Sequence, residues 1–133
     1  MPIKSTKDMV AEANAQLEVL TAEQAIALHG ADDVTFVDIR DVRELWRDGA
    51  VPGAWHVPRG MLEFWIDPTS PYAKEDFQSG KKFVLFCAGG MRSALAAKAA
   101  QDMGLEEVAH IETGFRGWKA AGGPVEAKEP KAR

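Results

Sequence analysis

Short apolar runs alternate with helix-forming segments along this chain. Residues 34–38 and 83–86 form two largely apolar runs, and residues 54–57 and 108–111 form two further short runs, each interrupted by a histidine. An apolar run bounded by turn residues predicts a strand that is buried on both faces. Strands that alternate with helices predict an α/β fold, in which helices cover both faces of a mainly parallel central sheet.

The segments between the strands carry helix signals. Thr21 and Gln24 have the spacing of a capping box, which predicts a helix that ends near Leu28. An alanine-rich segment follows Ser93, and Ser93 is predicted to be the N-cap of the helix there. Further helices are expected at 8–17, at 41–47 with Leu45 and Trp46 facing inward, and from Trp118 onward after a turn at 114–117. Trp118 is expected to pack under the sheet.

The segment 67–80 is a long connector for an α/β fold. It is polar and rich in turn residues, with only Tyr72 and Phe77 to anchor it. Two interpretations remain open, a short helix with a loop over a functional site or a segment that sets specificity. Phe64 and Trp65 precede the connector, and an apolar wall beside the site is one role open to them.

Cys87 is the only cysteine of the chain and directly follows the apolar run 83–86. Gly89 and Gly90 permit a tight loop, in which backbone N–H groups can turn inward and form an anion-binding nest. A helix N-terminus and the charge of Arg92 also favour an anion there. The alternative is a buried cysteine that acts as a small apolar residue. Three features favour the reactive interpretation: the strand end, the glycine pair and the arginine.

Four segments of the chain resemble motifs of the rhodanese (thiosulfate sulfurtransferase) family, in the family's order. Residues 87–93 resemble the active-site loop, and residues 36–41 resemble the strand that ends in Asp-Val-Arg. Residues 49–58 resemble the Gly-His-Ile-Pro-Gly-Ala motif, with Ala50 where the family commonly has histidine. Residues 114–118 resemble the closing glycine-rich turn and tryptophan. The resemblance implies a rhodanese-like three-layer fold for a domain spanning 20–125.

This resemblance also implies an activity and a set of site residues. The Cys87 thiolate would take the outer sulfur of thiosulfate or a similar donor and pass it from a persulfide to a thiol or cyanide. The implied substrate-binding residues are those of the loop together with an arginine that precedes a helix: Ala88, Gly89, Gly90, Met91, Arg92, Ser93 and Arg59. Arg59 is equally consistent with an exposed arginine at a helix start. Asp38, Arg40 and Trp118 are expected to give structural support, although Asp38 or Arg40 could also touch substrate.

Two alternative functions remain. Cysteine phosphatases, including relatives with the rhodanese fold, place five residues between cysteine and arginine, and arsenate reductases share this chemistry. Here only four residues separate Cys87 from Arg92, and a loop of that length is expected to be too small for phosphate or arsenate. The second alternative is a non-catalytic or redox-sensing rhodanese-like module that binds a protein partner. The presence of the cysteine counts against a degenerate domain but not against a sensor.

Composition narrows the class of protein further. The chain has 133 residues, 46% of them hydrophobic, enough for one domain with its own core. A single cysteine excludes an intrachain disulfide and favours a reducing, cytoplasmic setting. The net charge of −4 gives no basic field for nucleic acid, and neither a signal peptide nor a membrane span is apparent. No metal site or cofactor is expected. Residues 1–19 are expected to be a helical extension, and 126–133 a disordered tail.

Overall fold

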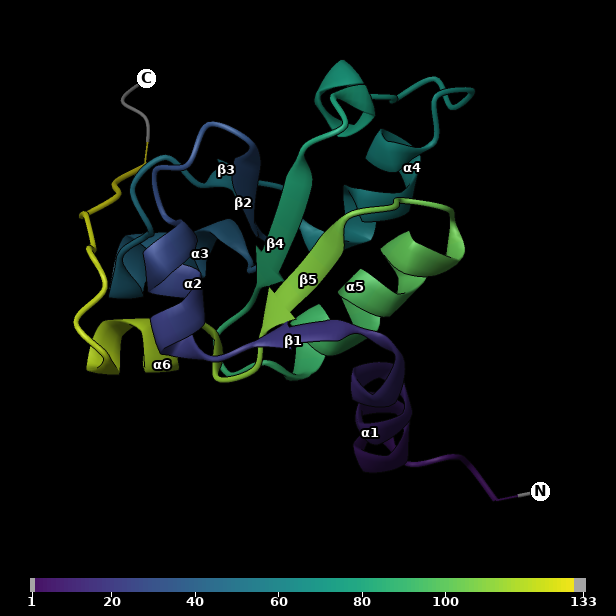
Figure 1. Ribbon diagram of the computed structural model, residues 1–133, viewed down its shortest axis with the longest axis horizontal. Helices are drawn as coiled ribbons and strands as arrows, with labels where there is room; N and C mark the ends of the chain where they lie inside the picture. The colour runs from purple at the N-terminus through teal and green to yellow at the C-terminus, as the bar shows by residue number, and fades with distance from the viewer. Residues whose placement is uncertain (1, 131–133) are drawn as a thin grey trace.

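The computed structural model describes residues 2–130 as an α/β domain with one five-stranded sheet (Figure 1). The strands are β1 (Glu18–Leu20), β2 (Val34–Asp38), β3 (Trp55–His56), β4 (Lys82–Phe86) and β5 (Val108–Ile111). The helices are α1 (Thr6–Gln16), α2 (Ala22–Leu28), α3 (Val42–Asp48), α4 (Leu62–Ile66), α5 (Met91–Asp102) and α6 (Gly114–Ala120). Two short 3-10 turns occur at η1 (Arg59–Met61) and η2 (Glu75–Gln78).

Every strand pairing in the sheet is parallel, and the strand order is β1-β5-β4-β2-β3. The predicted fold class is therefore confirmed. β4 lies in the centre, where Val84 pairs with Phe36 of β2 and with Ala109 of β5. Central strands of parallel sheets are buried on both faces, which is why residues 83–86 of β4 form an unbroken apolar run.

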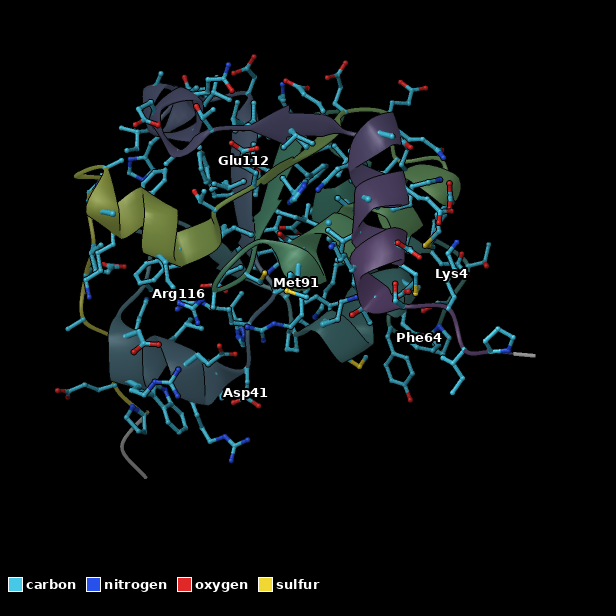
Figure 2. All side chains as sticks on the ribbon, turned by 90° about the horizontal axis from the view of Figure 1, so that it is seen from below. Lys4, Asp41, Phe64, Met91, Glu112 and Arg116 are labelled. Carbon is cyan, nitrogen blue, oxygen red and sulfur yellow. The ribbon has the colours of Figure 1, made fainter. Side chains whose placement is uncertain are left out.

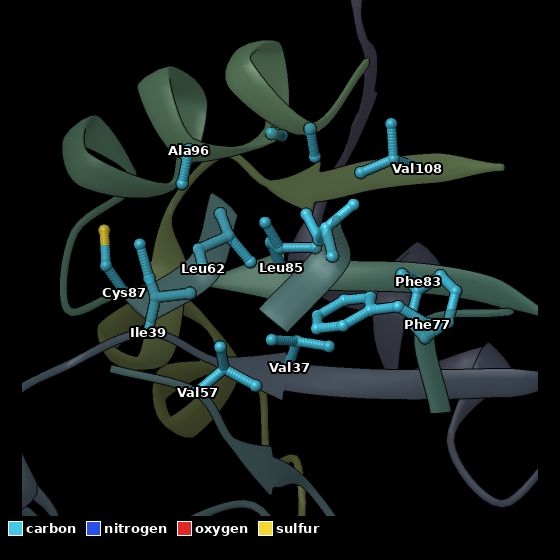
Figure 3. Close-up of a cluster of buried hydrophobic side chains, with 13 residues drawn as sticks. Val37, Ile39, Val57, Leu62, Phe77, Phe83, Leu85, Cys87, Ala96 and Val108 are labelled. Atoms are coloured by element: carbon cyan, nitrogen blue, oxygen red, sulfur yellow. The ribbon is translucent and has the colours of Figure 1, made fainter. Parts of the chain in front are cut away.

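Successive residues of β4 point to opposite faces of the sheet and feed two separate cores. Leu85 packs in one core beneath α4 and α5, together with Val37, Leu62 and Ala96 (Figure 3). The other core lies on the side of α2 and α6 and contains Phe36, Val84, Phe86, Ile111, Phe115 and Trp118. Figure 1 shows the helices in two layers, with α2, α3 and α6 on one side and α4 and α5 on the other.

Several local predictions are confirmed. Thr21 and Gln24 form the capping box at the start of α2, with both reciprocal hydrogen bonds present. Leu45 is buried on α3, and Trp118 is fully buried under the sheet. These features depend on local signals or on strongly apolar residues, which sequence patterns report well.

Other local predictions are wrong. The N-cap of α5 is Gly90, and Ser93 lies inside the first turn, where it is buried and bonded to His110. The segment 114–117 is the first turn of α6 and not a separate turn. Trp46 is 40% exposed, because it points about 100° away from Leu45, which occupies the buried side of α3.

The ends of the sheet hold two departures from the sequence pattern. β1 has three residues, Glu18–Leu20, and was not predicted. The predicted disordered tail is wrong at Glu126, which forms an antiparallel bridge with Ala50 through two backbone hydrogen bonds of 2.8 Å. The prediction for residues 131–133 falls outside the described residues. Across the part of the chain that the structure describes, no helix is both long and apolar enough to span a membrane.

Candidate active site

Cys87 lies at the carboxyl end of the central strand β4, between the sheet and the first turn of α5 (Figure 3). Its side chain is 1% exposed. The backbone N–H of Gly90 donates to Cys87 Sγ at 3.1 Å, and the N–H of Ser93 donates to it at 3.4 Å. Ser93 Oγ lies 3.6 Å from the sulfur. The loop therefore surrounds one sulfur atom with donors that folding has already fixed.

Gly90 makes this loop possible because its backbone has a φ of 104°. A Cβ on Gly90 would also lie 2.0 Å from the carbonyl oxygen of Glu112. Of the two loop glycines, Gly90 alone has the left-handed conformation, since Gly89 is absent from the positive-φ residues. A Cβ on Gly89 would meet only the guanidinium end of Arg116, at 3.0 Å.

Gly90→Ala is expected to displace the loop from Cys87, whereas Gly89→Ala should keep it. Left-handed strain contributes about 1–3 kcal/mol in the alanine variant of Gly90, and the contact with a backbone oxygen adds to it. Urea unfolding and the rate of Cys87 alkylation measure the two consequences. Equal stability and equal alkylation in the two variants would contradict the role assigned to Gly90.

The N-terminal turn of α6 holds the first half of the loop. The N–H of Phe115 donates to the carbonyl oxygen of Cys87 at 2.8 Å, and the N–H of Arg116 donates to that of Ala88 at 3.1 Å. Gly114 approaches the loop so closely that a Cβ would lie 2.6 Å from Cys87 O. The motif 114–118 thus serves as a backbone clamp on the cysteine loop.

Arg116 is a site residue that the sequence reasoning did not single out. Its side chain is exposed and its guanidinium lies against Gly89 of the loop. Within residues 2–130, no carboxylate forms an ion pair with it. The only signal in the sequence was its position inside the Gly-Phe-Arg-Gly-Trp motif. Figure 2 looks onto this edge of the sheet, with Met91 central and Arg116 to one side.

Arg92, the arginine of the loop, is engaged by a neighbouring helix. Its guanidinium donates to both carboxylate oxygens of Glu44 on α3, at 2.9 and 3.0 Å. The bond to Glu44 raises the pKa of Arg92, with a smaller contribution from the nearby Cys87 sulfur. In turn, the hydrogen bond from Arg92 lowers the pKa of Glu44. Glu44 therefore offsets part of the positive charge that the sequence suggested for this loop.

Asp38 and Arg40 form a buried ion pair at the end of β2. The Asp38 carboxylate accepts from Nε and Nη2 of Arg40, at 2.8 Å for the shortest bond, and both side chains are at most 1% exposed. Nη2 also donates to Gly49 O, and the guanidinium lies 4.3 Å from the ring centroid of Phe115. These contacts connect the end of β2 to Gly49, which follows α3, and to Phe115 on α6. This is the position of a pair that supports the structure.

Neither Arg59 nor Met91 forms a hydrogen bond with the sulfur. Arg59 pairs with Glu63 at 2.7 Å and lines a groove between α1 and α5. Met91 begins α5 and is 58% exposed. Of the predicted connector anchors, Phe77 is buried and Tyr72 is 58% exposed, with an edge contact to the exposed Phe64. Among the residues that the structure describes, no cluster of His, Cys, Asp and Glu side chains has the arrangement of a metal site.

Comparison with known proteins identifies one family. The model of the rhodanese-like domain matches residues 21–121. The solved structure of a Rhodopseudomonas palustris protein of unknown function, described as a possible tyrosine phosphatase, is 62% identical. The comparison covers 95% of this chain and 99% of that one, with a TM-score of 0.91.

Two more distant proteins carry different descriptions. The dual specificity phosphatase Cdc25 of Arabidopsis thaliana is 25% identical over 82% of this chain and 77% of its own length. The single-domain sulfurtransferase RDL2 of Saccharomyces cerevisiae is 24% identical over 80% of this chain and 92% of that chain, with a TM-score of 0.63. The likeness to the yeast protein concerns the fold.

Proposed function

We propose that this chain, which belongs to the rhodanese-like domain family, is a sulfurtransferase that carries a transferable sulfur on Cys87. The single observation that supports this most strongly is the geometry at Cys87 Sγ. Two backbone N–H groups donate to the sulfur, and a third polar group, Ser93 Oγ, lies beside it. The two backbone N–H donors are preorganised and stabilise an anionic sulfur without further reorganisation.

The proposed reaction has two steps. In the first, the Cys87 thiolate attacks the outer sulfur of thiosulfate, a new S–S bond forms, and sulfite leaves with the electron pair of the broken S–S bond. In the second, an acceptor nucleophile attacks the outer sulfur of the Cys87 persulfide. The Cys87 thiolate leaves with the electron pair of that S–S bond, which restores the free protein. This is covalent catalysis by a cysteine nucleophile with ping-pong kinetics.

Three groups receive roles in this scheme. The N–H groups of Gly90 and Ser93 stabilise the negative charge on the sulfur, both in the free thiolate and in the persulfide. Arg116 attracts the anionic donor, since it is exposed beside the loop and has no ion pair within the described range. Arg92 has a weaker electrostatic role, because both terminal nitrogens of its guanidinium already donate to the Glu44 carboxylate. The acceptor we propose is a small thiol or a protein thiol in a reducing compartment, with cyanide serving in the assay.

Phosphatase activity is the second candidate, because two similar proteins carry that description. Phosphate transfer needs an arginine that clamps the equatorial oxygens of the phosphoryl group. Here the loop has four residues between Cys87 and Arg92, and both terminal nitrogens of the arginine donate to Glu44. We therefore expect the loop to accept one sulfur atom and to exclude a tetrahedral phosphate.

Measuring both reactions on one preparation tests this choice. The protein should convert thiosulfate and cyanide to thiocyanate and should show negligible hydrolysis of aryl phosphates. Glu44→Gln, which frees Arg92, serves as the informative variant and should still lack phosphatase activity. Phosphate release that depends on Cys87 in either protein would favour the phosphatase. Absence of both reactions would favour the third candidate, a module that binds a protein partner or senses redox state.

A further inference from the structure

A chain of three hydrogen-bonded contacts leads from Cys87 to the N-terminal helix. Cys87 Sγ donates to Ser93 Oγ at 3.6 Å, and Ser93 Oγ lies 2.9 Å from Nδ1 of His110 on β5. Nε2 of the same ring lies 2.7 Å from Oδ1 of Asn14 on α1. Asn14 and His110 are 96 positions apart in the sequence. Ser93 and His110 are both 0% exposed, so the two bonds of Ser93 Oγ are shielded from water, whereas the bond to the half-buried Asn14 lies nearer the surface.

The two ring nitrogens of His110 must have opposite roles. Burial lowers the pKa of His110 to about 4, so the ring is neutral near neutral pH and carries one proton. A neutral imidazole has one donor nitrogen and one acceptor nitrogen. Asn14 Oδ1 only accepts, which assigns the proton to Nε2. Nδ1 then accepts from the hydroxyl of Ser93 at 2.9 Å, a shorter contact than the 3.3 Å from that hydroxyl to its other acceptor, the backbone oxygen of Gly90. The oxygen of the hydroxyl is left to accept from the thiol of Cys87.

We propose that Asn14 is a positioning residue for the active-site sulfur: it fixes the tautomer of His110 and thereby aims the Ser93 hydroxyl hydrogen away from Cys87. The sulfur then faces the lone pairs of Ser93 Oγ, an arrangement that favours the protonated thiol. The backbone N–H groups of Gly90 and Ser93 act in the opposite direction and favour an anion. The chain of contacts therefore restrains the reactivity that the loop confers.

The charged groups around this chain are engaged elsewhere or lie at its margin. On α5, Arg92 is paired with Glu44 of α3. At the end of β2, Arg40 is paired with Asp38. On α6, Arg116 lies against Gly89. Burial is the only cause of the lowered pKa of His110, so no charged side chain biases its ring directly.

This inference deepens the proposed function and rests on it for its meaning, because it concerns the same sulfur atom. Asn14 lies outside the segment 21–121 that the family model matches. The N-terminal helix would accordingly be part of the active site and not only a cover for α5, against which it packs. Residues 1–19 would supply a property that the family segment alone lacks.

The tautomer of His110 can be observed directly in the wild-type protein by nitrogen-15 NMR of labelled histidine. The ring signals are assigned by comparison with His110→Phe, since the chain has three histidines. We expect a neutral ring with its proton on Nε2. A proton on Nδ1 would overturn the proposal without the need for any further variant.

Asn14→Leu tests the effect on the sulfur. Loss of the acceptor frees the tautomer, so that Nδ1 can donate to Ser93. The Ser93 hydroxyl can then donate to the thiolate, which as an anion is a stronger acceptor than the neutral Gly90 O beside it. The curve of the iodoacetamide alkylation rate of Cys87 against pH should then move to lower pH. Where that rate still rises with pH, the variant should react about fivefold faster than wild type, which corresponds to the free energy of one net hydrogen bond. In alkaline solution, where both proteins are thiolates, the two rates should converge.

Two further variants separate this effect from simple loss of packing. Asn14→Asp keeps an acceptor oxygen and should retain the proton on Nε2 of His110. The midpoint pH of Cys87 alkylation in this variant should be equal to or higher than that of wild type. Glu12→Ala alters an exposed ion pair on the same helix and should match wild type. An Asn14→Leu profile equal to wild type, or a rate difference that persists in alkaline solution, would contradict the proposal. Alkylation needs no sulfur donor, so failure of sulfur transfer leaves this test intact and failure of this test leaves sulfur transfer intact.

Discussion

Replacing Cys87 with serine is expected to lower thiocyanate formation by about a thousandfold or more, because the reaction has no other route to a covalent sulfur intermediate. The chain has no second cysteine that could take over the sulfur. Serine retains a side chain that can accept from the N–H groups of Gly90 and Ser93, so the loop should keep its shape. The loss should therefore appear in the chemical step, with the free energy of unfolding near that of wild type.

A displaced cysteine provides the matched control for this variant. Ser79 is exposed and precedes β4, at the strand end opposite to the cysteine loop, so Cys87→Ser combined with Ser79→Cys restores the cysteine count but not the geometry. We expect this double variant to be as inactive as Cys87→Ser. Substantial turnover in the double variant would mean that any accessible thiol suffices, and the loop would lose its assigned role.

Replacing Asp38 with alanine is expected to lower the free energy of unfolding by about 3–5 kcal/mol, because it leaves the buried Arg40 cation without its counterion. Arg40 is 0% exposed and cannot turn to water without opening the core. One of its nitrogens, Nη1, already has no hydrogen-bond partner among the described residues. Within residues 2–130, the backbone oxygen of Gly49 would then be the one remaining hydrogen-bond acceptor for this guanidinium.

Asp48→Ala is the control for Asp38→Ala, since Asp48 forms the same kind of aspartate–arginine ion pair with Arg47, but at the surface. Both side chains of that pair are substantially exposed, and surface ion pairs contribute about 0–1 kcal/mol. Urea unfolding should thus separate the two variants clearly. Similar losses in both would show that burial does not set the strength of the Asp38–Arg40 pair.

The sheet and the cysteine loop were predictable because their signals are local. A continuous apolar run such as 83–86 indicates a central strand wherever it occurs, and the spacing of Thr21 and Gln24 indicates a helix start on its own. The mainly parallel arrangement of the strands followed from the alternating pattern of strands and helices. Cys87 was found because it follows a strand and precedes two glycines.

The parts that the sequence did not reveal depend on partners distant in the chain. Serine is a residue type that often forms an N-cap, but the hydroxyl of Ser93 is hydrogen-bonded to His110, and the helix begins earlier, at Met91. Arg92 is drawn to Glu44, which precedes it by 48 residues. β1 has only three residues and exists because it pairs with β5. No periodicity within a short window encodes such contacts.

Trp46 and Glu126 illustrate a related effect at the surface. Hydrophobicity placed Trp46 inside, but the one buried face of α3 is already occupied by Leu45. Trp46 instead lines a cavity together with Lys128 and Glu129 of the C-terminal segment. The charged residues of that segment predicted a disordered tail, whereas the backbone of Glu126 pairs with that of Ala50. Backbone pairing does not depend on side-chain polarity, and composition therefore misses it.

Intact mass spectrometry after incubation with thiosulfate tests the central claim most directly. The wild-type protein should gain the mass of one sulfur atom, cyanide should remove that mass, and Cys87→Ser should gain nothing under the same conditions. A wild-type protein whose mass never changes, or a Cys87→Ser variant that gains the same mass, would contradict the account of Cys87 as a sulfur carrier.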